Sequence, residues 1–174
     1  MGGRVAMEVV RIAPHRVAGL ALLDTGYLAK ADGEEGDEEV RKRMALLHIA
    51  QTQGVRAMAQ EWVKGMVHPN RLSDSVLLEA ILKMFERKSA EIFANQLHAL
   101  IERPDATPVL QSIQVPSLIL CGLQDSWATP AQHQAMQHQV PHAVISMIDG
   151  AGHMAPMERP QAVSESMLKW LSDC

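Results

Sequence analysis

The sequence predicts an α/β fold in which about three parallel strands alternate with helices. Three short runs, at 17–24, 116–121 and 143–148, are apolar at nearly every position. The first of these runs, at 17–24, has the pattern typical of a parallel strand that is buried on both faces. Helical patterns lie around these runs, and strands that alternate with helices indicate a parallel sheet covered on both sides.

The first elements are a helix and a strand. Residues 4–13 carry Val5, Val9 and Ile12 at helical spacing, and Pro14 ends this pattern. The apolar run that follows, residues 17–24, ends at a Thr25-Gly26 turn.

A long segment separates this strand from the next. Residues 27–114 comprise 88 positions, whereas a complete βαβ unit needs only about 30 residues. The sequence therefore predicts an insertion over residues 30–107, between core segments 1–29 and 108–174. It begins with an acidic stretch at 32–39 that leads into a helix. Three further helical stripes follow, the second with Ser73 or Asp74 as its N-cap: Val55, Met58, Ala59, Trp62, Val63 and Met66; Val76, Leu77, Ala80, Ile81, Met84 and Phe85; Phe93, Leu97, Leu100 and Ile101.

The last part of the chain returns to strand, turn and helix. Thr129 and Pro130 form an N-cap followed by proline at the first helical position, which predicts a helix to about Gln139. The strand at 143–148 comes next. Pro160 then begins a terminal helix with one apolar face, formed by Val163, Met167, Trp170 and Leu171.

Composition narrows the class of protein. The 174 residues suffice for one domain with a core, and 47% are apolar with a formal net charge of −4. This balance predicts neither nucleic-acid nor membrane partners. Cys121 lies in an apolar strand and Cys174 is the last residue, so a disulfide framework is not indicated. Glu8 and Arg11 interrupt the N-terminal region, which therefore does not resemble a signal peptide, and we expect a cytoplasmic protein.

The sequence predicts no cofactor and no metal. It contains no glycine loop of the kind that cradles phosphates. Three histidines cluster at His133, His138 and His142, but they do not share one helical face, and Pro141 interrupts the segment.

Two glycine turns present the side chains that carry chemistry. The run LILCGLQD at 118–125 ends in Asp125, and the run GAGH at 150–153 ends in His153, 28 residues later. Each lies just after a predicted strand. A carboxylate followed by an imidazole in this order is typical of two members of an acid–base–nucleophile triad. A turn-forming aspartate and an ordinary surface or core histidine are the alternative interpretations.

These pieces resemble, in order, the C-terminal portion of an α/β-hydrolase. The segment MGGR at 1–4 is similar to the turn after the nucleophile, and the insertion at 30–107 is placed where that family carries its helical cap. Gly122 to Asp125 with Pro130 resemble the acid loop, and Gly152-His153 with Glu158-Arg159-Pro160 resemble the histidine loop and last helix.

The resemblance implies a role for each of these residues. His153 would be the general base, and Asp125 would accept a hydrogen bond from its imidazole. Met1 and Gly2 would flank the nucleophile elbow, with the amide of Met1 as an oxyanion donor. The nucleophile itself would be a serine directly before Met1, so the chain alone is expected to be close to inactive.

The resemblance further implies a small ester, lactone or related carbonyl compound as substrate. Trp127 is a candidate for the pocket wall, with a buried structural role as the alternative. Met58, Met66 and Met84 either line a pocket or pack between helices. A second hypothesis is a non-catalytic α/β-hydrolase-like domain that acts through a partner or as a homo-oligomer, joined through the exposed edge of the strand at 17–24.

Overall fold

The computed structural model describes residues 1–173, so Cys174 lies outside the described residues. These residues form two compact units. Unit 1 contains Met1–Tyr27, the short segment Met66–His68 and the chain from Asp105 onward, and unit 2 contains Leu28–Gly65 and Pro69–Pro104. None of the helices among residues 1–173 combines the length and the apolar character that crossing a membrane requires.

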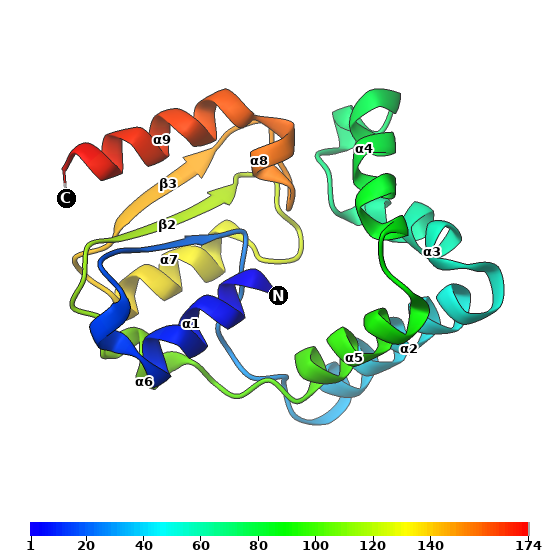
Figure 1. The fold of residues 1–174 in the computed structure, drawn as a ribbon, viewed down its shortest axis with the longest axis horizontal. Coiled ribbons are helices and arrows are strands. Elements are labelled where there is room, and N and C mark those ends of the chain that lie inside the picture. The colour runs from blue at the N-terminus through cyan, green and yellow to red at the C-terminus, as the bar shows by residue number, and fades with distance from the viewer. Residues whose placement is uncertain (174) are drawn as a thin grey trace. The chain divides into compact units, whose positions relative to one another are not determined.

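Unit 1 is built on a parallel sheet of three strands in the order β1-β2-β3 (Figure 1). The strands are β1 (Leu20–Leu23), β2 (Ser117–Gly122) and β3 (Val144–Ile148). Its helices are α1 (Gly2–Ile12), α6 (Thr107–Gln111), α7 (Pro130–Gln139), α8 (Ala155–Glu158) and α9 (Pro160–Ser172). The predicted α/β fold with three parallel strands is therefore confirmed.

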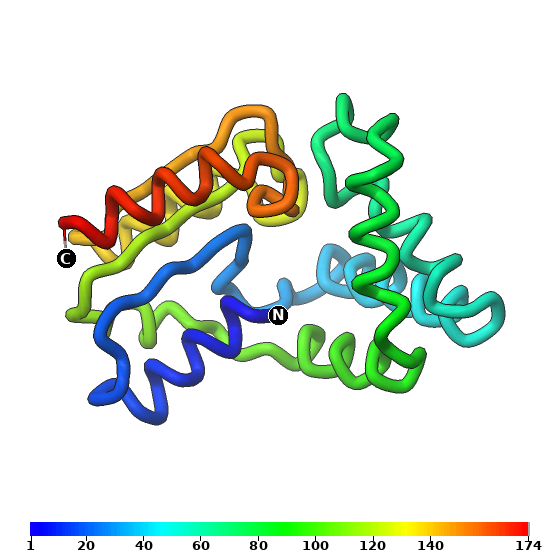
Figure 2. Tube along the Cα trace, turned by 45° about the horizontal axis from the view of Figure 1, so that its top comes forward, coloured from blue at the N-terminus to red at the C-terminus, as the bar shows by residue number. Residues whose placement is uncertain are grey.

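Helices cover both faces of this sheet. The side chains of β2 point alternately to the two faces, so they pack against both layers of helices. Leu118 and Leu120 pack with Val163 and Trp170 of α9, which runs alongside β2 and β3 (Figure 1, Figure 2). Ile119 faces the opposite layer, together with apolar side chains of α1, α6 and α7. All six residues of β2 are buried, as expected for a strand with a neighbour on each side.

Two predicted elements of unit 1 need correction. The first strand spans only Leu20–Leu23 rather than residues 17–24, because a 3₁₀ turn at Pro14–Arg16 precedes it and Asp24 leaves the strand with a φ of 47°. In α1, Met7 and Val10 are buried, whereas Val5, Val9 and Ile12 are 57%, 41% and 67% exposed. Both sets have helical spacing, so the pattern alone did not identify the face that packs on the sheet.

Unit 2 consists of α2 (Gly33–Gln53), α3 (Val55–Trp62), α4 (Ser75–Glu86) and α5 (Ala90–Ile101). Its core includes Leu47, Met58, Phe93 and Leu97. The indole of Trp62 lies 5.4 Å from the ring of Phe85 and 5.3 Å from that of Phe93. Asp74, one of the two predicted caps, accepts the Leu77 amide hydrogen at the start of α4.

One residue of the apolar stripe that begins at Val55 lies outside the helix predicted there. The helical spacing in the sequence places Met66 in this stripe, but α3 ends at Trp62 and a 3₁₀ turn follows at Val63–Gly65. Met66 is buried and belongs to unit 1. Of the other two methionines, Met58 is fully buried in the core of unit 2 and Met84 is 37% exposed.

Candidate active site

The carboxyl ends of the three parallel strands bring three ionisable side chains to one edge of the sheet. Asp24 follows β1 directly, Asp125 follows β2, and His153 follows β3. Of these, Asp125 and His153 are in direct contact: Nδ1 of His153 lies 2.8 Å from Oδ2 of Asp125. Residues 28 positions apart in the sequence are thus paired, as the two glycine turns predicted.

The carboxylate of Asp125 is held by the turn that follows it. Its Oδ1 accepts hydrogen bonds from the amides of Trp127 at 2.8 Å and Ala128 at 3.0 Å. The side chain is fully buried, and Oδ2 is left to the imidazole. Backbone donors on one oxygen and a ring nitrogen on the other satisfy an ionised carboxylate, which only accepts hydrogen bonds.

This contact fixes the arrangement of the His153 ring. Because the carboxylate accepts, the proton of a neutral imidazole lies on Nδ1, and the lone pair of Nε2 is directed away from Asp125. The side chain of His153 is 27% exposed. Trp127 lies beside it, with the two ring centroids 5.0 Å apart at an interplanar angle of 49°. Such a neutral, oriented imidazole can remove a proton from a hydroxyl group.

The two loops that carry these side chains are packed back to back. A side chain at Gly122 would overlap the carbonyl oxygens of Ala151 and Gly152, so only glycine fits at this close approach. Gln124 joins the two loops. Its backbone amide donates to the carbonyl of Ala151 at 3.0 Å, and its side-chain Oε1 accepts the Gly150 amide hydrogen at 2.9 Å. The glycines of both predicted turns therefore have a packing role as well as a turning role.

Asp24 is a third carboxyl group at this edge, which the sequence analysis did not identify. Its Oδ1 accepts the Gly122 amide hydrogen at 2.9 Å, and the residue is 8% exposed. Burial raises the pKa of Asp24 to about 7, and the negative charge of Asp125 adds to this increase. Hydrogen bonds from the backbone amides of Gly122 and Ala155, and the charge of His153, act in the opposite direction. Asp24 comes directly after a strand, much as Asp125 comes after a strand and a turn. This position was the sequence signal that could have identified Asp24 as a residue of the site.

His133 is also part of this region, although its place in the sequence indicated only that it does not form a metal site with His138 and His142. Its ring is fully buried, Nε2 accepts the Thr25 amide hydrogen at 3.2 Å, and Nδ1 lies 3.0 Å from the Thr129 carbonyl. Since Nε2 accepts, Nδ1 carries the proton. Burial lowers the pKa of His133. Its spacing of three residues to Met136, on the buried face of α7, was the signal of a core position.

The other predicted site residues, Met1 and Gly2, form the beginning of α1. The carbonyl of Met1 accepts the amide hydrogens of Arg4 and Val5 at 2.9 and 3.2 Å. The next residue, Gly3, approaches Thr25 so closely that a Cβ would lie 2.6 Å from its side chain. The start of α1 is therefore placed beside the turn that follows β1.

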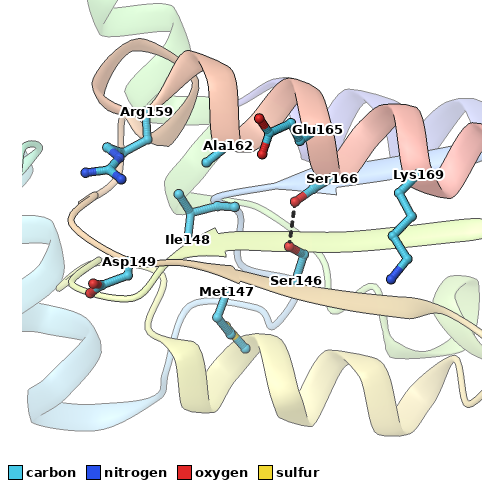
Figure 3. Close-up of a pocket in the computed structure, with 9 residues that line it drawn as sticks. All are labelled: Ser146, Met147, Ile148, Asp149, Arg159, Ala162, Glu165, Ser166 and Lys169. Carbon is cyan, nitrogen blue, oxygen red and sulfur yellow. Dashed lines mark hydrogen bonds between the residues drawn. The ribbon is translucent and has the colours of Figure 1, made fainter.

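A groove of about 410 Å³ lies elsewhere on unit 1, between β3 and α9 (Figure 3). Its two serines, Ser146 and Ser166, bond to each other through their hydroxyls at 2.9 Å. None of its lining residues is Asp125, His153 or Trp127. Cys121 offers no alternative nucleophile, because it is fully buried and burial raises the pKa of its thiol to about 12.

Comparison with known proteins finds similar sequences along most of the chain. The model of the alpha/beta hydrolase family matches residues 1–166. A 3-oxoadipate enol-lactonase from Acinetobacter baylyi is 28% identical over 130 residues, which cover 74% of this chain and 48% of the lactonase. This chain thus spans about half the length of that relative.

Solved structures give the same result. A thermophilic esterase from Thermogutta terrifontis superposes with a TM-score of 0.86 at 28% identity, over 99% of this chain and 62% of the esterase. The enol-lactonase from Burkholderia xenovorans shares the fold, with a TM-score of 0.83 at 24% identity over 99% of this chain and 63% of that one. With the match of its family model over most of its length, this chain belongs to the alpha/beta hydrolase family.

Proposed function

We propose that this chain carries the general base and the acid of a serine-type hydrolase that cleaves an ester, lactone or related carbonyl compound. The observation that carries the proposal is the contact of 2.8 Å between Nδ1 of His153 and Oδ2 of Asp125, with Oδ1 held by two backbone amides. An esterase and an enol-lactonase among the similar proteins support this class of substrate. In this proposal unit 1 is the hydrolase core, and unit 2 is the helical cap.

The proposed nucleophile is a serine directly before Met1, the position that the resemblance of MGG at 1–3 to a nucleophile elbow implies. Nε2 of His153 removes the proton of the serine hydroxyl as the serine oxygen attacks the substrate carbonyl. The same imidazole then protonates the leaving alkoxide. It later activates the water that hydrolyses the acyl-enzyme and releases the carboxylic acid product. Asp125 keeps the proton on Nδ1 and stabilises the imidazolium. The Met1 amide is the proposed oxyanion donor, and Trp127 the proposed wall of the substrate pocket.

The test is a polypeptide in which a strand ending in G-x-S precedes Met1, assayed with a short p-nitrophenyl ester. We expect turnover that His153→Ala reduces by a factor on the order of 10⁴ or more, and that Asp125→Asn reduces by roughly 10⁴. His138→Ala, at an exposed position of α7, is the matched control and should leave the rate unchanged. An ester-hydrolysis rate that His153→Ala does not alter would remove the base from the proposal.

A second candidate function is a non-catalytic domain that acts through self-association or a partner. The exposed apolar face of α1, with Val5, Val9 and Ile12, favours this candidate. Strand β1, which pairs with β2 alone among the described strands, offers a second edge for association. Turnover by the serine-containing polypeptide decides between the two functions.

A further inference from the structure

Glu158 is a buried carboxylate that the proposed chemistry does not use. It ends α8 and is only 2% exposed. Its Oε1 accepts the Gly152 amide hydrogen at 2.8 Å, and its Oε2 accepts the His68 amide hydrogen at 2.6 Å. One side chain thus bonds the residue before His153 and a residue 90 positions away in the sequence.

The segment Met66–His68 lies directly against the histidine loop. The amide of His153 donates to the carbonyl of Met66 at 2.7 Å. A Cβ on Gly152 would lie 2.7 Å from that carbonyl oxygen and 2.9 Å from the His68 nitrogen, so the two backbones are in van der Waals contact. Residues on both sides of this segment in the sequence belong to unit 2, whereas the segment itself belongs to unit 1.

A carboxylate is the group that this junction requires. Gly152 is buried and His68 is partly buried, and both present N–H donors at this junction, which cannot bond to each other. A carboxylate offers two acceptor oxygens and no donor, whereas the amide of glutamine would direct its NH₂ group at one of the two N–H groups. Bonds to an ionised acceptor are also stronger than neutral ones.

We propose that Glu158 is the positioning residue of the catalytic base: by joining Gly152 to Met66–His68, its carboxylate holds the histidine loop where the His153 ring meets Asp125. The inference rests on the proposed function of His153. The Gly152 and His153 amides are both fixed to this junction, the first through Glu158 and the second through Met66. The backbone of the base is therefore held from one side while Asp125 holds its ring from the other.

The experiment compares the chain with its Glu158→Gln variant by two measurements that do not depend on turnover. Hydrogen–deuterium exchange followed by mass spectrometry reports the amides of peptides over residues 150–154 and 65–69. We expect roughly tenfold or faster exchange in both peptides, because each loses a bond to a charged acceptor. ¹⁵N NMR of labelled histidines at alkaline pH, with His153 assigned by a His153→Gln variant, reports the ring tautomer. We expect the Nδ1–H form of His153 in the parent chain and a tautomer mixture in the variant.

The controls separate positioning from general loosening. His133 also carries its proton on Nδ1, held by Thr25 and Thr129, and its tautomer should not change in Glu158→Gln. Glu165→Gln, at an exposed position of α9, should change neither measurement. Gly152→Ala keeps Glu158 but displaces Met66 by steric overlap, and should reproduce the effect on His153.

The outcomes are distinct. Faster exchange in both peptides with an unchanged His153 tautomer would overturn the proposal and leave Glu158 a purely structural group. Unchanged exchange would show that the carboxylate does not hold the junction, and would overturn it as well. Failure of the proposed hydrolase activity would appear only in the ester assay, because neither of these measurements depends on a nucleophile.

Discussion

Two buried residues respond to pH with opposite sign in the same range. Asp24 has a folded-state pKa of about 7, above that of an unfolded aspartate, so between about pH 4 and pH 7 the folded state binds more protons. Its contribution to stability is present at low pH and is lost as pH rises to 7. The pKa of His133 is lowered, so its contribution is present above about pH 6.5 and is lost as pH falls below that value.

We expect Asp24→Asn to gain stability relative to the parent chain as pH rises from 4.5 to 7.5. The neutral amide removes the cost of ionising a buried carboxyl, which amounts to about 1.4 kcal/mol for each unit of pKa shift and so to roughly 2–4 kcal/mol over this range. Urea unfolding of both proteins at several pH values, followed by tryptophan fluorescence, measures the difference. A difference between the two proteins that does not change with pH would show that Asp24 is already ionised at pH 4.5.

His133→Gln should show the reverse dependence. The variant loses the imidazole that accepts the Thr25 amide hydrogen, so we expect it to be less stable than the parent chain at pH 8 by about 1–3 kcal/mol. The difference in the free energy of unfolding between the two proteins should narrow as pH falls from 6.5 to 5. Protonation of His133 then opposes folding of the parent chain, and the variant has no such group at this position. The same unfolding measurements test this, with His138→Gln as the control at an exposed position.

Among the elements, α7 positions the acid turn. Thr129 accepts the Gln132 amide hydrogen at 3.3 Å, and the Gln132 side chain accepts that of Thr129 at 3.1 Å, which forms a capping box. We expect Thr129→Ala to lower the free energy of unfolding by about 1 kcal/mol. Thr52→Ala removes only a hydroxyl that bonds the His48 carbonyl at an exposed position, and should change it by less than about 0.5 kcal/mol. Equal losses in the two variants would contradict the capping role.

Element boundaries followed local chemistry wherever that chemistry was specific. The proline at the first position of α7 and its threonine cap were predicted correctly from the sequence, whereas for α4 the sequence left Ser73 and Asp74 as alternatives and the structure shows Asp74 as the cap. The short helices α6 and α8 were missed, since five and four residues are too few to show an apolar period. The face of α1 was undetermined for a different reason: two apolar stripes share that helix, and only packing selects between them.

For the whole molecule we expect self-association. Val5, Val9 and Ile12 form an exposed apolar face on α1, and β1 has one unpaired edge in the described sheet. Size-exclusion chromatography with light scattering at micromolar concentration should show species larger than the 19.1 kDa chain. Val9→Lys should reduce them, whereas Val76→Lys, 80% exposed on α4, should not. A sharp monomeric peak for the parent chain would contradict this expectation.

The sequence by itself determined the order of the strands and the longer helices along the chain, and it placed Asp125 and His153 after two of the strands. Apolar runs, proline and glycine act through local backbone preferences, and a residue that follows a buried parallel strand must lie at the carboxyl edge of the sheet. These signals depend only on near neighbours, so they are present before the chain folds.

Only the tertiary structure decided which other polar groups are buried and what they bond. Asp24, His133 and Glu158 each bind a backbone amide 90 to 108 residues away, at Gly122, Thr25 and His68. A backbone amide has no signature in the sequence, and an aspartate, histidine or glutamate has the same letter whether it is buried or exposed. Packing removes water from these groups, and the loss of water leaves each one dependent on a partner that the fold alone supplies.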